Sequence, residues 1–233
     1  MRLGFHILVL WLLMTNAAQA GCRLALALAI DVSSSVDRDE YNLQRLGLAA
    51  ALDAPEVRFA ILNGAKGDVA LAVYEWSGFY QHKLHLDWTL LKTEADISRA
   101  ALTIGAMKRK HDDFPTSIGP ALGYGATLLE RAPDCDRKVI DMSGDGINNY
   151  GYGPDAAFRN FMFENVTVNG LVILSNSTGV VEYYRQNVLH GRNAFLIIAK
   201  GFPEFREAMT RKLYREINDI VLGSAPHGTD ERT

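Results

Sequence analysis

The chain has 233 residues, of which 24 are Lys or Arg and 27 are Asp or Glu, so its net charge near neutral pH is only −3. This balance, with no basic cluster longer than the one at 108–110, argues against a nucleic-acid partner. The length suits a single domain with a substantial hydrophobic core.

The first twenty residues have the features of a secretory signal peptide. Arg2 supplies a positive start, an apolar run follows over 3–14, and Ala18-Gln19-Ala20 is a small-residue cleavage pattern. The apolar run is shorter than the roughly 20 residues that a membrane-spanning helix needs. We therefore expect a signal peptide over 1–20, cleavage after Ala20, and a secreted or periplasmic protein with no membrane span. A retained anchor and lipidation of Cys22 are the alternatives.

Strand-like and helix-like segments alternate after this leader. The predicted strands are apolar or alternating runs at 24–30, 68–76, 81–90, 138–143, 168–174 and 194–199. The predicted helices have apolar side chains at helical spacing and cover residues 40–52, 94–110, 117–130, 155–164, 180–188 and 204–222. Only a short turn separates the second and third strands, which should form an antiparallel hairpin.

This alternation predicts an α/β domain with a mainly parallel sheet, one antiparallel edge strand and helices on both faces. The sequence contains no internal repeat, low-complexity stretch or linker, so we expect one domain over 21–222 and a disordered polar tail over 223–233. Ligands of such open sheets bind at the carboxyl ends of the strands, where polar clusters are therefore of interest.

Three polar clusters fall at such positions. Asp31, Ser33 and Ser35 follow the first strand, Thr116 opens a helix, and Asp145 follows a central strand. These two carboxylates and three hydroxyls form an all-oxygen set that suits Mg²⁺, Mn²⁺ or Ca²⁺ and is poor for zinc. Because hydroxyl ligands are neutral, the charge of a bound cation stays partly uncompensated. An open coordination position would then attract a carboxylate from outside.

The clusters resemble the metal-ion-dependent adhesion site (MIDAS) of von Willebrand factor A (vWA) domains, and the order of elements is similar over residues 23–222. The motifs that carry the resemblance are Asp31-x-Ser33-x-Ser35, Thr116 in a Thr-x-Ile-Gly-x-Ala-Leu context, and Asp145-Gly146. The resemblance implies a three-layer, Rossmann-like fold with a six-stranded sheet. The chain further resembles secreted bacterial single-vWA proteins of unknown function.

The same resemblance implies roles for the five residues. Ser33, Ser35 and Thr116 would coordinate the metal directly, and Asp31 and Asp145 would act through water, with direct contact of Asp145 left open. An acidic side chain of a protein partner would complete the coordination sphere. The chain is then a binding protein and not an enzyme, and its oligomeric state stays open.

Gly144 and Asp141 are two unusual residues near the predicted site. The family usually has Ser or Thr directly before Asp-Gly, whereas Gly144 stands between Ser143 and Asp145 here. Asp141 lies inside a predicted strand, where we interpret it as a buried, hydrogen-bonded acid that supports the site from below rather than as a ligand.

Other interpretations of the same residues remain open. The Gly144-Asp145-Gly146 loop also resembles a haloacid dehalogenase-like phosphotransferase or phosphatase, but Ser33 stands where that mechanism needs a carboxylate. Alternatively, this is a structural protein with a degenerate metal site, in which Thr116 and either Ser35 or Asp37 cap helices. No Gly-x-Ser-x-Gly motif indicates a serine hydrolase, and the six histidines are scattered, with His82 and His85 expected in solvated positions.

We expect three segments to surround the metal on one face: Trp76-Ser77, 111–115 and 147–152. Tyr150 and Tyr152 lie among glycines, so they are either exposed contact residues or fold back over the helix below.

The two cysteines, Cys22 and Cys135, favour one disulfide over two free thiols, because the signal peptide directs the chain to an oxidising compartment. In the resembling fold these cysteines begin neighbouring parallel strands, about 4.8 Å apart. That separation is within the range that a disulfide accepts.

Overall fold

The computed structural model describes residues 21–175 and 178–218. The expected signal peptide, the expected tail and the last four residues of the expected final helix lie outside these ranges. A six-stranded sheet has the order β3-β2-β1-β4-β5-β6. The strands are β1 (Cys22–Asp31), β2 (Asp68–Trp76), β3 (His82–Leu91), β4 (Cys135–Gly144), β5 (Val166–Ile173) and β6 (Leu196–Ala199).

The sheet is parallel except at one edge. Strand β3 pairs antiparallel with β2, and every other neighbouring pair is parallel. This arrangement confirms the predicted fold class, including the single antiparallel edge strand made by the hairpin. Because β1 and β4 are central, the loops that follow them lie side by side at the carboxyl edge of the sheet.

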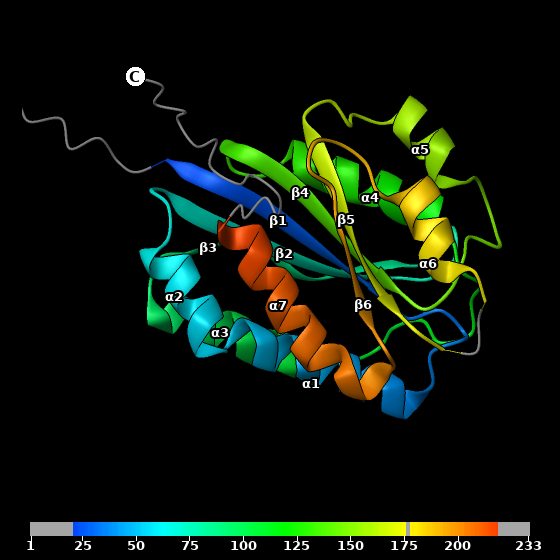
Figure 1. The fold of residues 1–233 in the computed structure, drawn as a ribbon, viewed down its shortest axis with the longest axis horizontal. Coiled ribbons are helices and arrows are strands. Elements are labelled where there is room, and N and C mark those ends of the chain that lie inside the picture. The colour runs from blue at the N-terminus through cyan, green and yellow to red at the C-terminus, as the bar shows by residue number, and fades with distance from the viewer. Residues whose placement is uncertain (1–20, 176–177, 219–233) are drawn as a thin grey trace, which may run out of the picture.

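Helices cover both faces of the sheet, so the molecule has three layers (Figure 1). One face carries α1 (Arg38–Leu52), α2 (Pro55–Asn63), α3 (Glu94–Gly105) and α7 (Phe205–Asn218). The other carries α4 (Ile118–Glu130), α5 (Pro154–Asn160) and α6 (Val180–Tyr183), which continues as the π-helical turn η1 (Tyr184–Val188). A short 3₁₀ turn, η2 (Phe202–Glu204), precedes α7.

The alternation of side chains along β1 builds two separate cores. Leu24, Leu26, Leu28 and Ile30 point to the layer of α1 and α7, whereas the alanines between them point to α4. All of these side chains are buried, as expected for a parallel strand covered on both faces. The period of two therefore explains why an almost continuous apolar run serves both layers.

Helix α2 was not predicted, because Pro55 lies just after the expected helix over 40–52, where proline commonly marks a helix end. Proline is instead the first residue of α2, where its missing amide hydrogen would have had no partner within the helix. Val57, Ala60 and Ile61 form its buried face. Two expected helices also end earlier than predicted, α3 at Gly105 and α5 at Asn160.

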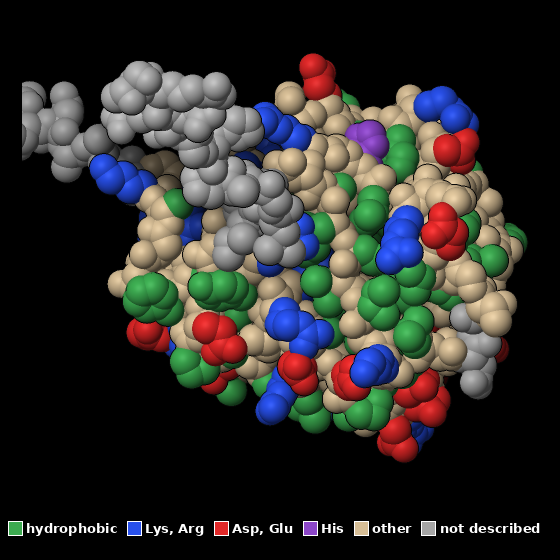
Figure 2. Space-filling model, in the orientation of Figure 1, with side chains coloured by type: hydrophobic (Ala, Val, Ile, Leu, Met, Phe, Trp, Pro, Cys, Tyr) green, Lys and Arg blue, Asp and Glu red, His purple; other side chains and the backbone are tan. Residues whose placement is uncertain are grey.

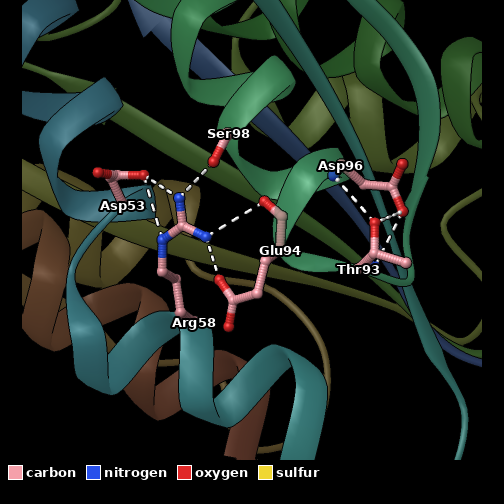
Figure 3. Close-up of polar contacts among 6 residues, drawn as sticks. All are labelled: Asp53, Arg58, Thr93, Glu94, Asp96 and Ser98. Atoms are coloured by element: carbon pink, nitrogen blue, oxygen red, sulfur yellow. Dashed lines mark hydrogen bonds and ion pairs between the residues drawn. The ribbon is translucent and has the colours of Figure 1, made fainter.

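Arg58 attaches α2 to α3. Its guanidinium pairs with Asp53, which follows α1, and with Glu94 in the first turn of α3 (Figure 3). It also donates a hydrogen bond of 2.7 Å to Ser98. The neighbouring start of α3 is closed by reciprocal hydrogen bonds between Thr93 and Asp96 (Figure 3). The two carboxylates that pair with Arg58 are exposed, so each pair contributes at most about 1 kcal/mol to stability.

A buried ionic cluster lies between the sheet and α7. Lys212 Nζ is 3.0 Å from Asp141 Oδ1 and 2.8 Å from Glu216 Oε1, and the side chains of all three are buried. Asn169 donates a 2.8 Å hydrogen bond to Glu216 Oε1. The partner of Asp141 is thus a lysine of α7, and the predicted support of the metal site by Asp141 is not what the contacts show.

Positive and negative side chains are interspersed over the face shown in Figure 2. This distribution agrees with the small net charge of the chain. None of the helices within the described residues is long and apolar enough to cross a membrane.

Candidate functional site

The loop after β1 is folded by its own backbone and by neighbouring loops. The amide of Ser33 donates to Asp31 Oδ1 at 2.8 Å, which turns the chain directly after the strand. The amide of Val32 donates to the carbonyl of Trp76 and that of Ser34 to the carbonyl of Phe114, both at 2.9 Å. These contacts hold the side chains of alternate residues toward the loop that follows β4.

All five predicted site residues come together at this edge of the sheet. Thr116 Oγ1 donates to Ser33 Oγ at 3.3 Å, and Ser33 Oγ lies 3.2 Å from Ser35 Oγ. Ser35 Oγ in turn donates to Asp145 Oδ1 at 2.7 Å. Asp31 joins the group through the amide of Ser33. Residues from three separate segments therefore place two carboxylates and three hydroxyls in one cluster.

Asp31 is the most unusual member of this cluster. It is fully buried, and its Oδ2 atom has no hydrogen-bond partner. Burial, with a further contribution from nearby Asp145, raises the pKa of Asp31 to about 7. A buried acceptor without a donor is costly, at about 1–3 kcal/mol. A cation beside the two carboxylates would remove that cost, so the donor set and its electrostatics fit a divalent metal.

The donor set differs from the more common metal sites of proteins. Within the described residues, no group of three or more His, Cys, Asp or Glu side chains is placed to hold a metal ion. Only two members of the cluster are carboxylates, and the remaining oxygens belong to hydroxyls. A search for acidic or histidine ligands alone therefore does not detect this arrangement.

Thr116 is positioned by the loop that follows Asp145. Its amide donates to Asn149 Oδ1 at 2.9 Å, and the amide of Asn149 donates back to the carbonyl of Thr116 at 2.9 Å. Asn148 Oδ1 accepts from the amide of Gly119 at 3.1 Å. The sequence analysis did not assign these asparagines, although their place directly after Asp145-Gly146-Ile147 was a signal for them.

Capping does not account for the position of Thr116. The residue that precedes α4 as its cap is Ser117, and its side chain makes no capping hydrogen bond. The cap of α1 is Asp37, which accepts from the amide of Glu40, so of the two alternatives Asp37 is correct and Ser35 is not. The hydroxyls of Ser35 and Thr116 point instead into the cluster.

Arg109 was also missed by sequence reasoning. Its guanidinium donates to the carbonyls of Val32 and Ser33 at 2.8 and 3.0 Å, and to that of His111 at 3.3 Å. It therefore ties the loop after β1 to the segment that leads to Thr116. Val32 and Ser33 lie more than 70 residues before Arg109 in the sequence, which is why no local motif revealed these contacts.

The surface around the cluster agrees only in part with the predicted rim. Tyr150 and Ile147 are exposed, with 55% and 43% of their surface accessible. The ring of Tyr152 packs against those of Phe79 and Phe161, so it folds back over the protein. Trp76 and Ser77 are fully buried and do not belong to the rim surface, although their carbonyls hold neighbouring loops.

The two histidines of the hairpin are not in the solvated positions expected for them. His85 Nε2 lies 2.9 Å from Glu75 Oε2. The other oxygen of this carboxylate, Oε1, accepts a hydrogen bond from the Tyr41 hydroxyl. The ring of His82 stacks on Tyr124 with centroids 4.8 Å apart. Both contacts cover the edge of the sheet and have no connection with the hydroxyl cluster.

Comparisons with known proteins agree with this description. The family described as "Protein of unknown function (DUF1194)" matches residues 21–221. No match was found among curated protein sequences.

Three solved structures are informative. Proximal thread matrix protein 1 from the mussel byssus, with a zinc-occupied MIDAS motif, has 20% identity and a TM-score of 0.61, over 86% of this chain and 48% of that one. The von Willebrand factor type A protein from Catenulispora acidiphila has 15% identity and a TM-score of 0.58, over 84% and 43%. The PilB minor pilin from Streptococcus sanguinis has 13% identity and a TM-score of 0.63, over 91% and 65%.

At these identities the similarity concerns the fold, which is that of vWA domains, as predicted. The chain spans about half the length of the mussel protein and less than half of the Catenulispora protein.

Proposed function

The chain belongs to the DUF1194 family and has a vWA-like fold, and from its site we propose that it binds a divalent cation and, through this cation, a protein partner. The observation that carries the proposal is the convergence of Ser33, Ser35, Thr116 and Asp145 beside the unpartnered Oδ2 atom of Asp31. Within a structural protein that used these residues only for packing, this buried carboxylate oxygen would have no reason to stay without a donor.

The chemistry of the donors favours a hard cation. Hydroxyl and carboxylate oxygens are ligands that Mg²⁺ and Mn²⁺ accept, and Ca²⁺ accepts a larger number of them. We propose Mg²⁺ or Mn²⁺ as the first choice. The mussel protein has zinc in its MIDAS motif, so zinc is included among the metals to be tested.

The partner would present a carboxylate. Five protein oxygens would leave one of the six positions of an octahedral ion open for an outside carboxylate. The exposed side chains of Ile147 and Tyr150 lie in the loop after Asp145 and would provide apolar contact around that carboxylate. This arrangement binds and does not catalyse, and the proposed place of action is the cell envelope or the exterior.

A metal titration tests the first half of the proposal. We expect isothermal titration calorimetry to detect one Mg²⁺ or Mn²⁺ site in the wild type, and the ion to raise the melting temperature. Ser33→Ala and Asp145→Asn should abolish the heat of binding. Ser34→Ala is the matched control, because Ser34 lies exposed in the same loop and its side chain does not join the cluster. Equal binding by Asp145→Asn and the wild type would contradict the site.

Capture from cell-envelope extracts tests the second half. Wild-type protein and Asp145→Ala would be immobilised, each with Mg²⁺ and with EDTA. The proposal expects a partner that binds only to the wild type and only with Mg²⁺. A partner captured equally in all four conditions would show that recognition does not pass through the metal.

A further inference from the structure

Tyr184 has a hydroxyl that needs an explanation. The residue is fully buried, and its hydroxyl has no hydrogen-bond partner. Buried tyrosines usually find a partner for this group, because leaving it unsatisfied costs about 1–3 kcal/mol. The packing of the ring alone would be served equally well by phenylalanine.

This hydroxyl faces the same point as the unpartnered oxygen of Asp31. A Cβ atom built on Gly144 would lie 2.6 Å from the Tyr184 hydroxyl and 2.8 Å from Asp31 Oδ2. Both atoms are buried and both lack a partner. One is a donor and the other, when ionised, only an acceptor, so the two are complementary across the α-carbon of Gly144.

Glycines in two neighbouring strands make room for the tyrosine. Beside Gly144 at the end of β4, Gly170 in β5 would bring a Cβ atom to 3.0 Å from Tyr184 Cδ1. The register pairs Gly170 with Met142, two residues before Gly144, so both glycines lie on the same face of the sheet. A side chain at Gly144 would clash with the hydroxyl of Tyr184, and one at Gly170 would meet Leu196 Cδ1 at 2.6 Å as well as the tyrosine ring.

The helical geometry also changes at Tyr184, from an α-helix to a π-helical turn. The amide of Leu189 donates to the carbonyl of Tyr184 at 3.0 Å, which closes a π-helical turn five residues long. Such turns are rare and occur frequently at functional sites. The hydroxyl of Ser143, the residue before Gly144, is not available to Asp31, because Ser143 Oγ donates to the carbonyl of Ala29 at 3.1 Å.

We infer that Tyr184 is a positioning residue of the metal site, whose hydroxyl orients the carboxylate of Asp31 when the cation is bound. The inference rests on the proposed metal site, because Asp31 needs an oriented, ionised carboxylate only when a cation is bound. It also gives the departure at Gly144 a physical reason. Glycine at this position leaves open the space between Asp31 Oδ2 and the hydroxyl of Tyr184 in η1, where the family usually has a hydroxyl on the strand itself.

The test uses two tyrosines that differ only in what their hydroxyls contact. Tyr184→Phe removes the hydroxyl beside Asp31. Tyr74→Phe is the matched control: Tyr74 is also fully buried on the same face of the sheet, but its hydroxyl donates to the carbonyl of Ala121 at 3.0 Å. Two quantities would be measured for each variant, the free energy of unfolding in EDTA and the dissociation constant for Mg²⁺ or Mn²⁺.

The inference expects opposite patterns. Tyr184→Phe should keep or raise the stability of the metal-free protein, because it removes an unsatisfied group, and weaken metal binding on the order of 10-fold. Tyr74→Phe should lower the stability and leave the dissociation constant unchanged. Unchanged metal binding in Tyr184→Phe would overturn the inference alone. Absence of metal binding in the wild type would overturn the proposed function and the inference with it.

Discussion

Cys22 and Cys135 are joined by a disulfide, with their Cα atoms 4.4 Å apart, at the start of the adjacent parallel strands β1 and β4. The far ends of the same two strands lead to Asp31 and Asp145. The predicted pairing is confirmed, and the bond lies at the edge of the sheet opposite the hydroxyl cluster. It therefore connects the two strands that carry the carboxylates without taking part in the site.

Replacing both cysteines by serine should lower stability without changing metal binding. The bond joins residues 113 positions apart. In the chain-entropy model a loop of this length corresponds to about 4–5 kcal/mol of stability. Denaturant unfolding in EDTA would measure the loss, and calorimetry the dissociation constant for Mg²⁺. A double variant with wild-type stability, or one that no longer binds the metal, would contradict the purely stabilising role.

A second prediction concerns acid stability and His82. Burial, and to a smaller extent His111, lowers the pKa of His82 to about 4 from an unfolded value near 6.5. The folded protein therefore binds fewer protons than the unfolded chain at this residue between these two values. The stability that neutral His82 contributes is complete above pH 6.5 and is lost as the pH falls toward 4.

His82→Phe keeps an aromatic ring against Tyr124 and cannot titrate. We expect the variant to gain stability relative to the wild type as the pH is lowered from 7 to 4, when both are measured by thermal melting. A difference between the two proteins that stays constant over this pH range would show that His82 protonation does not affect folding.

A third prediction concerns the ionic cluster under α7. Lys212→Met leaves two carboxyl groups, Asp141 and Glu216, buried without their cation. Removing one partner of a buried ion pair costs about 3–5 kcal/mol. Burial already raises the pKa of Asp141, and Glu216 raises it further while Lys212 opposes the rise. The loss should therefore be largest at neutral pH and shrink on acidification, as Asp141 becomes neutral.

Arg211→Met is the matched control for this variant. Arg211 is the preceding residue of the same helix, and it pairs with Glu207 at the exposed surface. Its substitution should change the free energy of unfolding by less than about 1 kcal/mol at every pH. Equal effects of the two substitutions would contradict the role assigned to the buried cluster.

The sequence was sufficient for those features that depend on local pattern. The apolar run before Asp31 predicted a strand buried on both faces, and the short turn before His82 predicted the antiparallel edge. The five cluster residues were identified because each follows a strand or opens a helix, where the topology brings loops together. Helix α2 was missed because its first residue is a proline, which commonly marks a helix end, although Val57, Ala60 and Ile61 had helical spacing.

The contacts between distant segments could not be predicted from the sequence. Arg109 binds backbone carbonyls of a loop more than 70 residues away, and carbonyls carry no sequence signal. Tyr184 lies in an expected helix, but its position depends on Gly144 and Gly170 in two other strands. Asp141 was correctly predicted to be buried, whereas its partner, Lys212, lies far along the chain in α7.

The proposal that Asp31, Ser33, Ser35, Thr116 and Asp145 hold one divalent cation can be tested by locating the ion. Its most direct test is a crystal structure of the protein grown with Mn²⁺, with the ion located by its anomalous scattering. We expect one strong peak at the carboxyl edge of β1 and β4, with the oxygens of Ser33, Ser35 and Thr116 at octahedral-ion distances of roughly 2.1 Å. A structure with Mn²⁺ at another place, or with no peak beside these hydroxyls at saturating Mn²⁺, would contradict it.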